Sequence, residues 1–527
     1  MVPQMRIHWM TSLFLLILCL AARNQAPWHF LFLLFTLSFI LPLFLTTWLV
    51  PSGFAWHKYS GNGPIAPGPI GWPLLGSLPL MGPLAHRKLS DLSKSHHASR
   101  LMALSFGATP VVISSHPDTA REILCSAAFG DRPTKVSARL LMFERAIGFA
   151  PSGDYWRHLR RIAANNMFSP RRIAALESLR HRVADGMIHR VSKEMERRGM
   201  VVLRGVLQKG SLESIVGSVF GKSPGELEEG KEFMEMVREG YELIGKFNLE
   251  DYFSLGGLLD FSGVGRRCEQ LTVRVKALIG KIVEERRRQG DFCKQDDFLS
   301  LLLALPKEES LSDSDIIAVL WEMIFRGTDV VAILLEWIMA RMVLHPRIQA
   351  KAQRELDAFV GGRPVQDSDM SNLRYLQAIV KEVLRLHPPG PLLSWARLAI
   401  RDVHVDKFFI PAGTTAMVNM WAITHDGSIW KDPWAFKPER FLQEDVGILG
   451  SDLRLSPFGS GRRVCPGRAL GLTTVHLWLA RLLQQYNWTA TSLPVQLSEC
   501  LRLSLEMKKP LVCRAVLRDL AMEANHA

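Results

Sequence analysis

Apolar residues form one long uninterrupted run near the amino terminus and a helical pattern through most of the remaining chain. Trp28 to Val50 comprises 23 residues with no charged side chain. At about 1.5 Å per residue this run makes roughly 34 Å of helix, which matches a bilayer hydrocarbon core of roughly 30 Å. Pro42 lies inside it, and membrane helices tolerate proline better than soluble helices do. Residues 28–50 are therefore predicted to be a transmembrane anchor.

The segments on either side of the anchor have different compositions. Residues 1–27 carry a shorter apolar stretch, Trp9 to Ala22, whose 14 residues end at Arg23. That length suits the apolar part of a signal peptide, so insertion and cleavage both stay open for this stretch. Residues 51–83 are rich in proline and glycine, which favours a stiff, extended linker. The remaining residues, 84–527, are predicted to form one large domain.

Helical periodicity dominates this domain, with a few strand-like runs. Leu101 to Phe106 and Pro110 to Ser114 flank a short turn, which is the pattern of a β-hairpin. Short strand-like runs recur between Arg397 and Val418. Helices are predicted over Asp154 to Phe168, Arg171 to Arg198, Val264 to Gln289 and Asn372 to Leu386. The fold class is therefore mainly α with a minor β sheet, preceded by an N-terminal transmembrane helix.

One predicted helix stands out by its length. Ser312 with Asp315 three residues later is a helix N-terminal signature, and an apolar-rich run then continues without proline to His345. About 32 residues at about 1.5 Å each give roughly 48 Å, so we expect this helix to cross the centre of the domain. Gly327 interrupts the run at a cost of roughly 1 kcal/mol relative to alanine. A close helix crossing and a bound ligand are both reasons for such a glycine.

Composition and charge narrow the classes of function. The chain has 527 residues, of which 48% are hydrophobic, and this excludes disorder as its main state. Lysine and arginine number 64 against 51 aspartates and glutamates, giving a net charge of +13. The excess is spread along the chain, which favours an acidic protein partner or an anionic membrane surface, and no nucleic-acid partner is expected. Seven cysteines without a C-x-x-C spacing indicate neither a disulfide framework nor a zinc site.

The richest cluster of candidate chemistry is the segment Ser456 to Gly467. Cys465 lies in this glycine-rich loop at the start of an apolar helix predicted from Arg468 to about Gln485. The glycines allow the backbone to approach a flat ligand, and N–H groups at a helix start stabilise a thiolate. Arg463 can pair with a carboxylate of the same ligand. Together these features describe an iron porphyrin held by cysteine.

The loop resembles the haem-binding pattern F-x-x-G-x-R-x-C-x-G of the cytochrome P450 monooxygenases, matched here by Phe458, Gly461, Arg463, Cys465 and Gly467. The resemblance extends from about Pro64 to the end of the chain. It implies the cytochrome P450 fold, with residues 84–527 as a haem-thiolate catalytic domain. It also implies haem b as the cofactor and Cys465 as the axial ligand of the haem iron.

A second set of residues matches the family's structural triad. Glu382 and Arg385 match its E-x-x-R signature, and Arg440 lies in a segment that resembles its P-E-R-F signature. Taken alone, a Glu and an Arg at this spacing make an ordinary surface ion pair worth a few tenths of a kcal/mol. The resemblance implies instead that the three side chains form a buried network that positions a loop.

Further matches concern the edge of the haem. Trp156 and Arg160 match the family's W-x-x-x-R signature, and Arg397 matches a propionate-binding position. Together with Arg463, these residues are implied to surround the haem propionates.

The sequence departs from the family pattern in the long helix. The common pattern A/G-G-x-D/E-T ends in an alcohol that helps deliver protons, and Val330 occupies that position here. Arg326 replaces the usual small first residue. Because valine cannot form a hydrogen bond, proton delivery would have to use Asp329, Thr328, water or a substrate hydroxyl. Asp329 is the stronger catalytic candidate, because the Thr328 hydroxyl can bond back to its own helix.

Finer details resemble the plant 78A subfamily, which is associated with organ size and the rate of leaf initiation. They are the segments Phe247 to Phe253, Phe325 to Asp329 and Pro388 to Pro391. The resemblance implies a single-pass protein of the endoplasmic reticulum membrane whose catalytic domain faces the cytosol. It also implies electron supply from NADPH through NADPH-cytochrome P450 reductase, with Arg161 and Arg462 as candidate docking residues.

The function indicated is monooxygenation of an apolar substrate that reaches the enzyme from membrane lipid. Fatty acids are the first substrate hypothesis, followed by terpenoids and steroids. One alternative is a haem-thiolate isomerase or dehydratase that acts on peroxides and needs no reductase, which would suit the missing alcohol. Another is a non-catalytic haem sensor. Retention of Asp329 and the normal spacing from Phe458 to Cys465 favour the monooxygenase.

Overall fold

The computed structural model describes residues 51–518, except residues 60, 134 and 394 and segments 223–229, 247–250, 252–262 and 291–295. The predicted transmembrane anchor, residues 28–50, and the N-terminal segment, residues 1–27, lie outside the described residues. Within the part of the chain that is described, no helix is long and apolar enough to cross a membrane.

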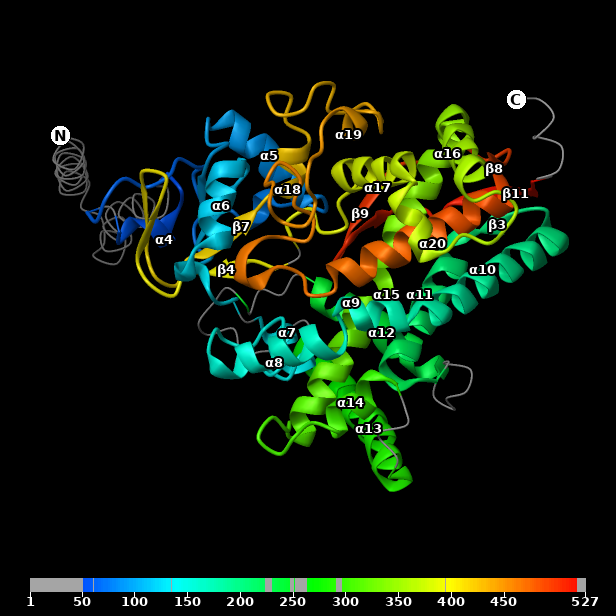
Figure 1. Ribbon diagram of the computed structural model, residues 1–527. Coiled ribbons are helices and arrows are strands. Elements are labelled where there is room, and N and C mark those ends of the chain that lie inside the picture. Colours follow the sequence, from blue (N-terminus) through cyan, green and yellow to red (C-terminus); the bar gives the residue numbers. More distant parts are fainter. Residues whose placement is uncertain are drawn as a thin grey trace, which may run out of the picture.

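The domain is built mainly of helices (Figure 1). The first half contains α4 (Phe54–His57), α5 (Ala85–Ser95), α6 (Pro117–Cys125), α7 (Val136–Leu141), α8 (Asp154–Asn166), α9 (Pro170–Ala175), α10 (Glu177–Arg198), α11 (Leu203–Phe220) and α12 (Gly230–Gly245). The second half contains α13 (Val264–Gln289), α14 (Phe298–Leu303), α15 (Asp313–Leu344), α16 (Pro346–Phe359), α17 (Arg374–Leu386), α18 (Met420–Thr424), α19 (Arg440–Gln443) and α20 (Arg468–Gln485). Short 3-10 turns are η2 (Leu78–Leu80), η3 (Ala127–Phe129), η7 (Asp367–Ser371) and η8 (Gly461–Arg463).

The strands form small sheets, and the four-stranded and three-stranded sheets lie at opposite ends of the helical body (Figure 1). They are β1 (Met102–Phe106), β2 (Thr109–Ser114), β3 (Val201–Val202), β4 (Arg397–Leu398), β5 (Val403–Val405), β6 (Phe408–Ile410), β7 (Thr415–Val418), β8 (Tyr486–Ala490), β9 (Glu499–Leu501), β10 (Leu505–Met507) and β11 (Val512–Leu517). The largest sheet has the order β1-β2-β7-β4, with β2 and β7 parallel. The predicted hairpin is its β1 and β2 pair, in which Met102 faces Ile113. The prediction of a mainly helical fold with a minor sheet is confirmed.

Helix α15 runs through the centre of the domain, as its predicted length required. Its first half packs into a hydrophobic core with α11 to α14, and its second half packs into another with α17 and α20. The Ser312 hydroxyl accepts a hydrogen bond from the Asp315 N–H and so caps the helix. A Cβ atom on Gly327 would lie 2.7 Å from the Ile215 side chain of α11. The glycine therefore permits a close helix crossing, one of the two reasons that the sequence left open.

Two predicted segments need a more detailed description. The single helix predicted from Arg171 to Arg198 is two helices, α9 and α10, which meet at Leu176, where ψ is 6°. In the segment predicted as a linker, residues 51–83, Trp56 is buried and its indole N–H donates to the Leu104 carbonyl oxygen over 2.8 Å. Part of this segment therefore packs against strand β1, and the boundary after residue 83 stays a prediction.

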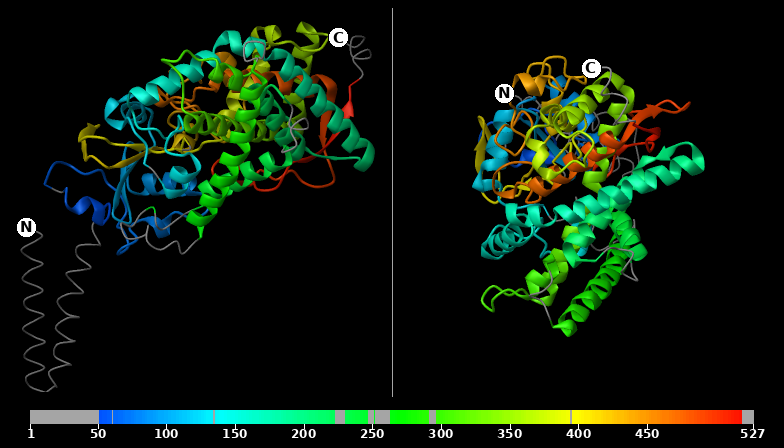
Figure 2. Two further views of the ribbon diagram at one scale, coloured as in Figure 1. Left: turned by 90° about the horizontal axis from the view of Figure 1, so that it is seen from below. Right: turned by 45° about the vertical axis from the view of Figure 1, so that its right-hand side comes forward.

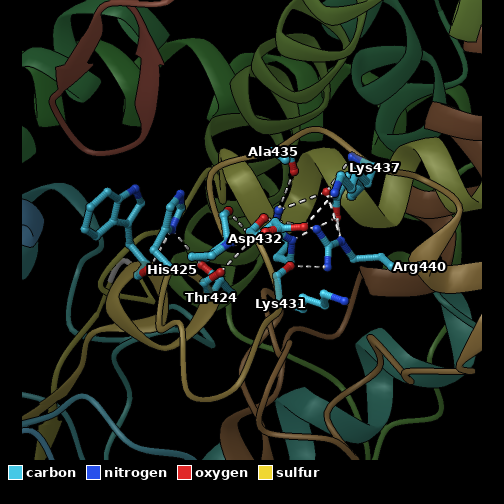
Figure 3. Close-up of polar contacts among 11 residues, drawn as sticks. Thr424, His425, Lys431, Asp432, Ala435, Lys437 and Arg440 are labelled. Carbon is cyan, nitrogen blue, oxygen red and sulfur yellow. Dashed lines mark hydrogen bonds and ion pairs between the residues drawn. The ribbon is translucent and has the colours of Figure 1, made fainter.

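The predicted triad of Glu382, Arg385 and Arg440 meets in a buried network, and Figure 3 shows the polar contacts around Arg440. Arg385 donates to both carboxylate oxygens of Glu382 over 2.8 and 2.9 Å, and Arg440 donates to the same carboxylate over 3.1 Å. The remaining donors of Arg385 bond to the carbonyl oxygens of Thr424, Pro433 and Ala435. The network therefore ties helix α17 to the chain that runs from α18 to α19. The side chains of Glu382 and Arg385 are fully buried, so this is not an ordinary surface ion pair.

Removing the acid from this network should destabilise the protein strongly. Glu382→Ala leaves the buried Arg385 without its counter-ion, which typically costs about 3–5 kcal/mol. Glu309→Ala is the matched control, because it breaks the exposed pair with Arg161 at 3.0 Å and should cost less than about 1 kcal/mol. Urea unfolding of the purified variants measures both losses, and similar losses would contradict the role given to the network.

Candidate active site

The cysteine singled out in the sequence lies where a hydrogen-bonded loop leads into helix α20. The Cys465 N–H donates to the Phe458 carbonyl oxygen over 3.0 Å, and the Ser456 hydroxyl donates to the Gly459 carbonyl oxygen over 2.8 Å. The 3-10 turn η8 lies just before the cysteine, and α20 begins at Arg468. The loop thus closes on itself and holds Cys465 at a fixed position.

A cavity lies between this loop and the middle of α15. Cys465 and Phe458 line it on the loop side, and Gly327, Val330 and Val331 line it on the α15 side. Most of its other side chains are apolar, among them Ile147, Ile215, Met323, Leu334, Leu384, Leu393 and Leu470. Such a cavity shields a flat cofactor and an apolar substrate from water.

Five arginines line the same cavity: Arg132, Arg160, Arg326, Arg397 and Arg463. Glu322 is the one acidic side chain among the described lining residues. Four of the arginines are fixed to the wall by backbone carbonyl oxygens: Arg132 by Trp395 at 2.8 Å, Arg160 by Val464 at 2.9 Å, Arg397 by Ser460 at 3.2 Å and Arg463 by Gly130 at 2.9 Å. The cavity therefore carries a large excess of positive charge on a rigid frame.

Burial shifts the titration of these groups. It lowers the pKa of both Arg397 and Arg463 to about 10, and it lowers the pKa of Arg160 as well. The pKa of Arg132 falls well below its usual range, because burial is reinforced by the neighbouring Arg397 and Arg463. Each of these lowered pKa values means that the cavity disfavours the charged form of the arginine. A ligand that brings negative charge into the cavity would relieve this cost.

Trp156 completes this part of the wall from helix α8. Its indole N–H donates to the Ile147 carbonyl oxygen over 3.0 Å, and the Arg463 guanidinium lies 4.5 Å from its ring centroid. Of the residues implied to bind the cofactor, Cys465, Phe458, Arg463, Trp156, Arg160 and Arg397 all line the cavity.

Gly461 contributes through its backbone, away from the cavity lining. Its φ of 68° lies in the left-handed region that favours glycine. A Cβ atom there would lie 2.2 Å from the Leu124 carbonyl oxygen, at the end of α6. The glycine therefore lets the cysteine loop pack tightly against that helix.

The two candidate catalytic residues of α15 do not line the cavity. The Thr328 hydroxyl donates to the Ile324 carbonyl oxygen over 2.7 Å, and its side chain is fully buried. Burial raises the pKa of Asp329 to about 6, and the charges that act on it are those of Glu506, Arg204 and Arg502. Asp329 therefore lies on the side of α15 that faces the C-terminal strands, whereas Val330 lies in the cavity wall.

Sequence reasoning missed two charged residues of the cavity. Arg132 belongs to no recognised signature, and it lies in a loop. No local sequence pattern therefore identifies it as a residue of the site. Glu322 lies one turn before Arg326 on the same face of an apolar helix, and that spacing was a usable signal. Its Oε1 atom accepts a hydrogen bond from the Gly148 N–H over 2.8 Å, and this bond ties α15 to the loop before α8.

A helical domain with a cysteine loop facing a long central helix across a buried cavity is the arrangement of the cytochrome P450 class of enzymes. The family model for cytochrome P450 matches residues 66–513 of the chain. Cytochrome P450 78A5 of Arabidopsis thaliana is 52% identical over 486 residues, with 89% of this chain and 93% of that protein covered. Cytochrome P450 78A3 of Glycine max is 50% identical, with 89% and 91% covered.

More distant proteins share the same framework. Flavonoid 3'-monooxygenase of Arabidopsis thaliana is 36% identical, with 86% of this chain and 91% of that protein covered. A zebra fish cytochrome P450 structure with progesterone has a TM-score of 0.72 and 25% identity, with 82% of this chain and 99% of that chain covered. The chain therefore belongs to the cytochrome P450 family, and its similarity to the 78A proteins extends over most of its length. It is a cytochrome P450 monooxygenase, an oxidoreductase.

The cavity fits the haem group that family membership implies. The Cys465 residue is half-buried and forms no disulfide, and desolvation raises the pKa of its thiol while the Arg326 charge and the Gly467 N–H oppose that rise. Coordination to iron would replace its proton. Arg132, Arg160, Arg397 and Arg463 supply the cationic donors that two propionates require.

The close approach at Gly461 can be tested by substitution. Gly461→Ala should destabilise the protein by about 2 kcal/mol or more, because the methyl group adds a backbone clash to the strain of a left-handed φ. Gly413→Ala is the control, since Gly413 has a φ of 83° but no atom within 4 Å of an added Cβ. Thermal unfolding of both variants separates clash from φ strain. Equal losses would show that packing against α6 contributes nothing.

Proposed function

We propose that this protein uses O2 and electrons from NADPH-cytochrome P450 reductase to hydroxylate an apolar, lipid-like substrate, with fatty acids as the first class to test. The observation that carries the proposal is Cys465, which lines a mainly apolar cavity and faces α15 across it. Haem b would bind there, with Cys465 as the axial ligand of its iron. When bound, the haem supplies the redox chemistry that activates O2, and a thiolate ligand favours O–O cleavage.

The residues of the chain have three tasks in this proposal. Arg397, Arg463 and Arg160 would hold the propionates of haem, and Phe458 with the glycines of the loop would lie against its ring. Val330, Val331 and Leu334 form an apolar wall opposite that face, which binds the substrate and excludes water. Asp329 is the proposed source of the proton that the reaction consumes, and because it lies outside the cavity lining, ordered water would carry that proton to the cavity.

The proposed location is the endoplasmic reticulum membrane, with residues 28–50 as a single span and the catalytic domain in the cytosol. Exposed apolar side chains near the start of the described chain support contact with membrane lipid. Trp72 is 58% exposed and Ile70 is 56% exposed. We further propose a role in plant growth control, which is what the resemblance to the 78A subfamily implies.

The peroxide isomerase or dehydratase remains the second candidate, and Val330 is the observation that favours it. That enzyme would need no proton relay to O2 and no reductase. A non-catalytic haem sensor has no feature of the cavity in its favour.

Dependence on the reductase separates these functions. The purified enzyme should consume NADPH and form product only when the reductase is added, and the rate should fall as salt concentration rises. Arg462→Glu should raise the reductase concentration needed for half-maximal rate by about two- to fivefold, because Arg462 is exposed and makes no ion pair with another described residue. Arg161 is already paired with Glu309, so Arg161→Glu should act less strongly. Conversion of a hydroperoxide without reductase or NADPH would instead establish the isomerase class.

The proton role of Asp329 is tested by a second comparison. A carboxyl with a pKa of about 6 exchanges protons readily near neutral pH. Asp329→Asn should therefore lower product formation by roughly 10²- to 10⁴-fold. Val330→Thr should leave the ratio of product to NADPH consumed unchanged or improve it. Thr328→Val should change it little, because that hydroxyl is bonded to Ile324.

Stability measurements control for misfolding of the Asp329 variant. The folded protein holds the Asp329 proton more tightly than the unfolded chain does, because the pKa of this carboxyl is raised to about 6 in the folded state. The protein therefore loses stability as the pH rises from the usual pKa of an aspartate, 3.8, through about 6. Asparagine stays neutral, so Asp329→Asn should be at least as stable as the wild type at neutral pH. If Asp329→Asn changes neither the turnover rate nor the ratio of product to NADPH consumed, Asp329 has a structural role only.

A further inference from the structure

Two charged side chains of the cavity, Glu322 and Arg326, have no task in the proposed reaction. They lie one helical turn apart on the same face of α15, and Val330 follows one turn further on. All three residues line the cavity. Glu322 and Arg326 therefore reach the space in which a substrate would lie, within a wall that is otherwise mainly apolar.

The Glu322 carboxylate uses one of its oxygens and leaves the other without a partner. Its Oε1 atom accepts a hydrogen bond from the Gly148 N–H over 2.8 Å, and a Cβ atom on Gly148 would lie only 2.5 Å from this oxygen. The residue is 5% exposed, and its Oε2 atom has no hydrogen-bond partner among the described residues. A buried carboxylate oxygen without a partner is costly, so a ligand that donates a hydrogen bond to Oε2 would be favoured.

The Arg326 guanidinium also lacks a hydrogen-bond partner. The other four arginines of the cavity each donate to backbone carbonyl oxygens of the wall. Arg326 makes no hydrogen bond or ion pair with any other described residue, and its guanidinium carbon lies 5.2 Å from the centroid of the Trp395 ring. The aromatic face attracts the cation and limits its movement, while the five N–H groups can still donate to a ligand.

The two opposite charges are neighbours without being in contact. Burial raises the pKa of Glu322, and the charge of Arg326 opposes that rise, yet no ion pair joins the two side chains among the described contacts. A hydrogen-bond acceptor thus lies on one side of a gap and donors lie on the other. A hydroxyl group suits both sides, because its O–H donates while its oxygen accepts.

We propose that Glu322 and Arg326 together bind a hydroxyl group of the substrate, which donates to Glu322 Oε2 and accepts from the Arg326 guanidinium. The apolar wall formed by Val330, Val331 and Leu334 takes the adjoining hydrocarbon. The inference rests on the proposed function, which it narrows from a lipid-like molecule to one that carries a hydroxyl group on its hydrocarbon skeleton. Glu322 and Arg326 are then specificity-determining residues.

The test compares binding of 1-dodecanol and of its methyl ether, 1-methoxydodecane, to the purified, haem-containing enzyme by isothermal titration calorimetry. The ether keeps the accepting oxygen and lacks the O–H. The wild type should bind the alcohol about 10- to 100-fold more tightly than the ether, the range expected for one hydrogen bond to a charged group.

Two variants separate the acceptor from the donor. Glu322→Gln can still accept from the Gly148 N–H but places an amide NH2 where Oε2 lies, so the alcohol should bind within about threefold of the ether. Arg326→Gln should weaken both ligands by a similar factor of about 10, because both need the guanidinium as a donor. Glu336→Gln is the matched control, since Glu336 is a buried glutamate of α15 outside the cavity lining, and it should leave the preference for the alcohol unchanged.

Other outcomes overturn the inference. Equal binding of the alcohol and the ether by the wild type would mean that water, and no substrate hydroxyl, fills the gap. A loss of haem from Arg326→Gln would assign Arg326 to a propionate of the cofactor. A change in the haem absorption spectrum showing that the alcohol oxygen binds the iron would also contradict the proposed contact. Binding is measured without the reductase and NADPH, so a failure of the monooxygenase reaction would be recognised separately.

Discussion

The constraint on which this structure depends is the burial of positive charge around one cavity. Five arginines converge there against a single acidic lining residue of the described chain, and burial depresses the pKa of four of them. A folded domain does not keep such an excess without a compensating ligand. The carboxylates of haem would compensate part of it. Cofactor binding thus meets an electrostatic requirement of the fold.

The rest of the fold keeps this cavity at fixed dimensions. Gly327 allows α11 and α15 to cross closely, and Gly461 allows the cysteine loop to pack against α6. The buried Glu382 and Arg385 tie helix α17 to the segment between α18 and α19, which precedes the cysteine loop in the sequence. Figure 2 shows two further views of the helical domain that these contacts hold together. Together these contacts limit how far Cys465 can move from the wall of α15.

Much of this could be predicted from the sequence, because local signals were strong. The bounds of α13 and α20 agree with their predicted ranges, and α15 begins at its predicted cap and ends before Pro346. The loop signature identified Cys465, and periodicity identified the helices. Long-range placement was beyond local patterns, since only the folded chain shows that Arg132 reaches the cavity. The direction of side chains on α15 was also open, because neighbouring residues such as Asp329 and Val330 differ by about 100° around a helix.

The absorption spectrum of the ferrous carbon monoxide complex tests the central claim most directly. The wild type should show the band that is diagnostic of a thiolate ligand, and Cys465→Ala should lose it. Cys125→Ala is the matched control, since Cys125 is exposed and lies outside the cavity lining, and it should retain the band. A thiolate band that persists in Cys465→Ala, or one that disappears in Cys125→Ala, would contradict the placement of the haem at Cys465.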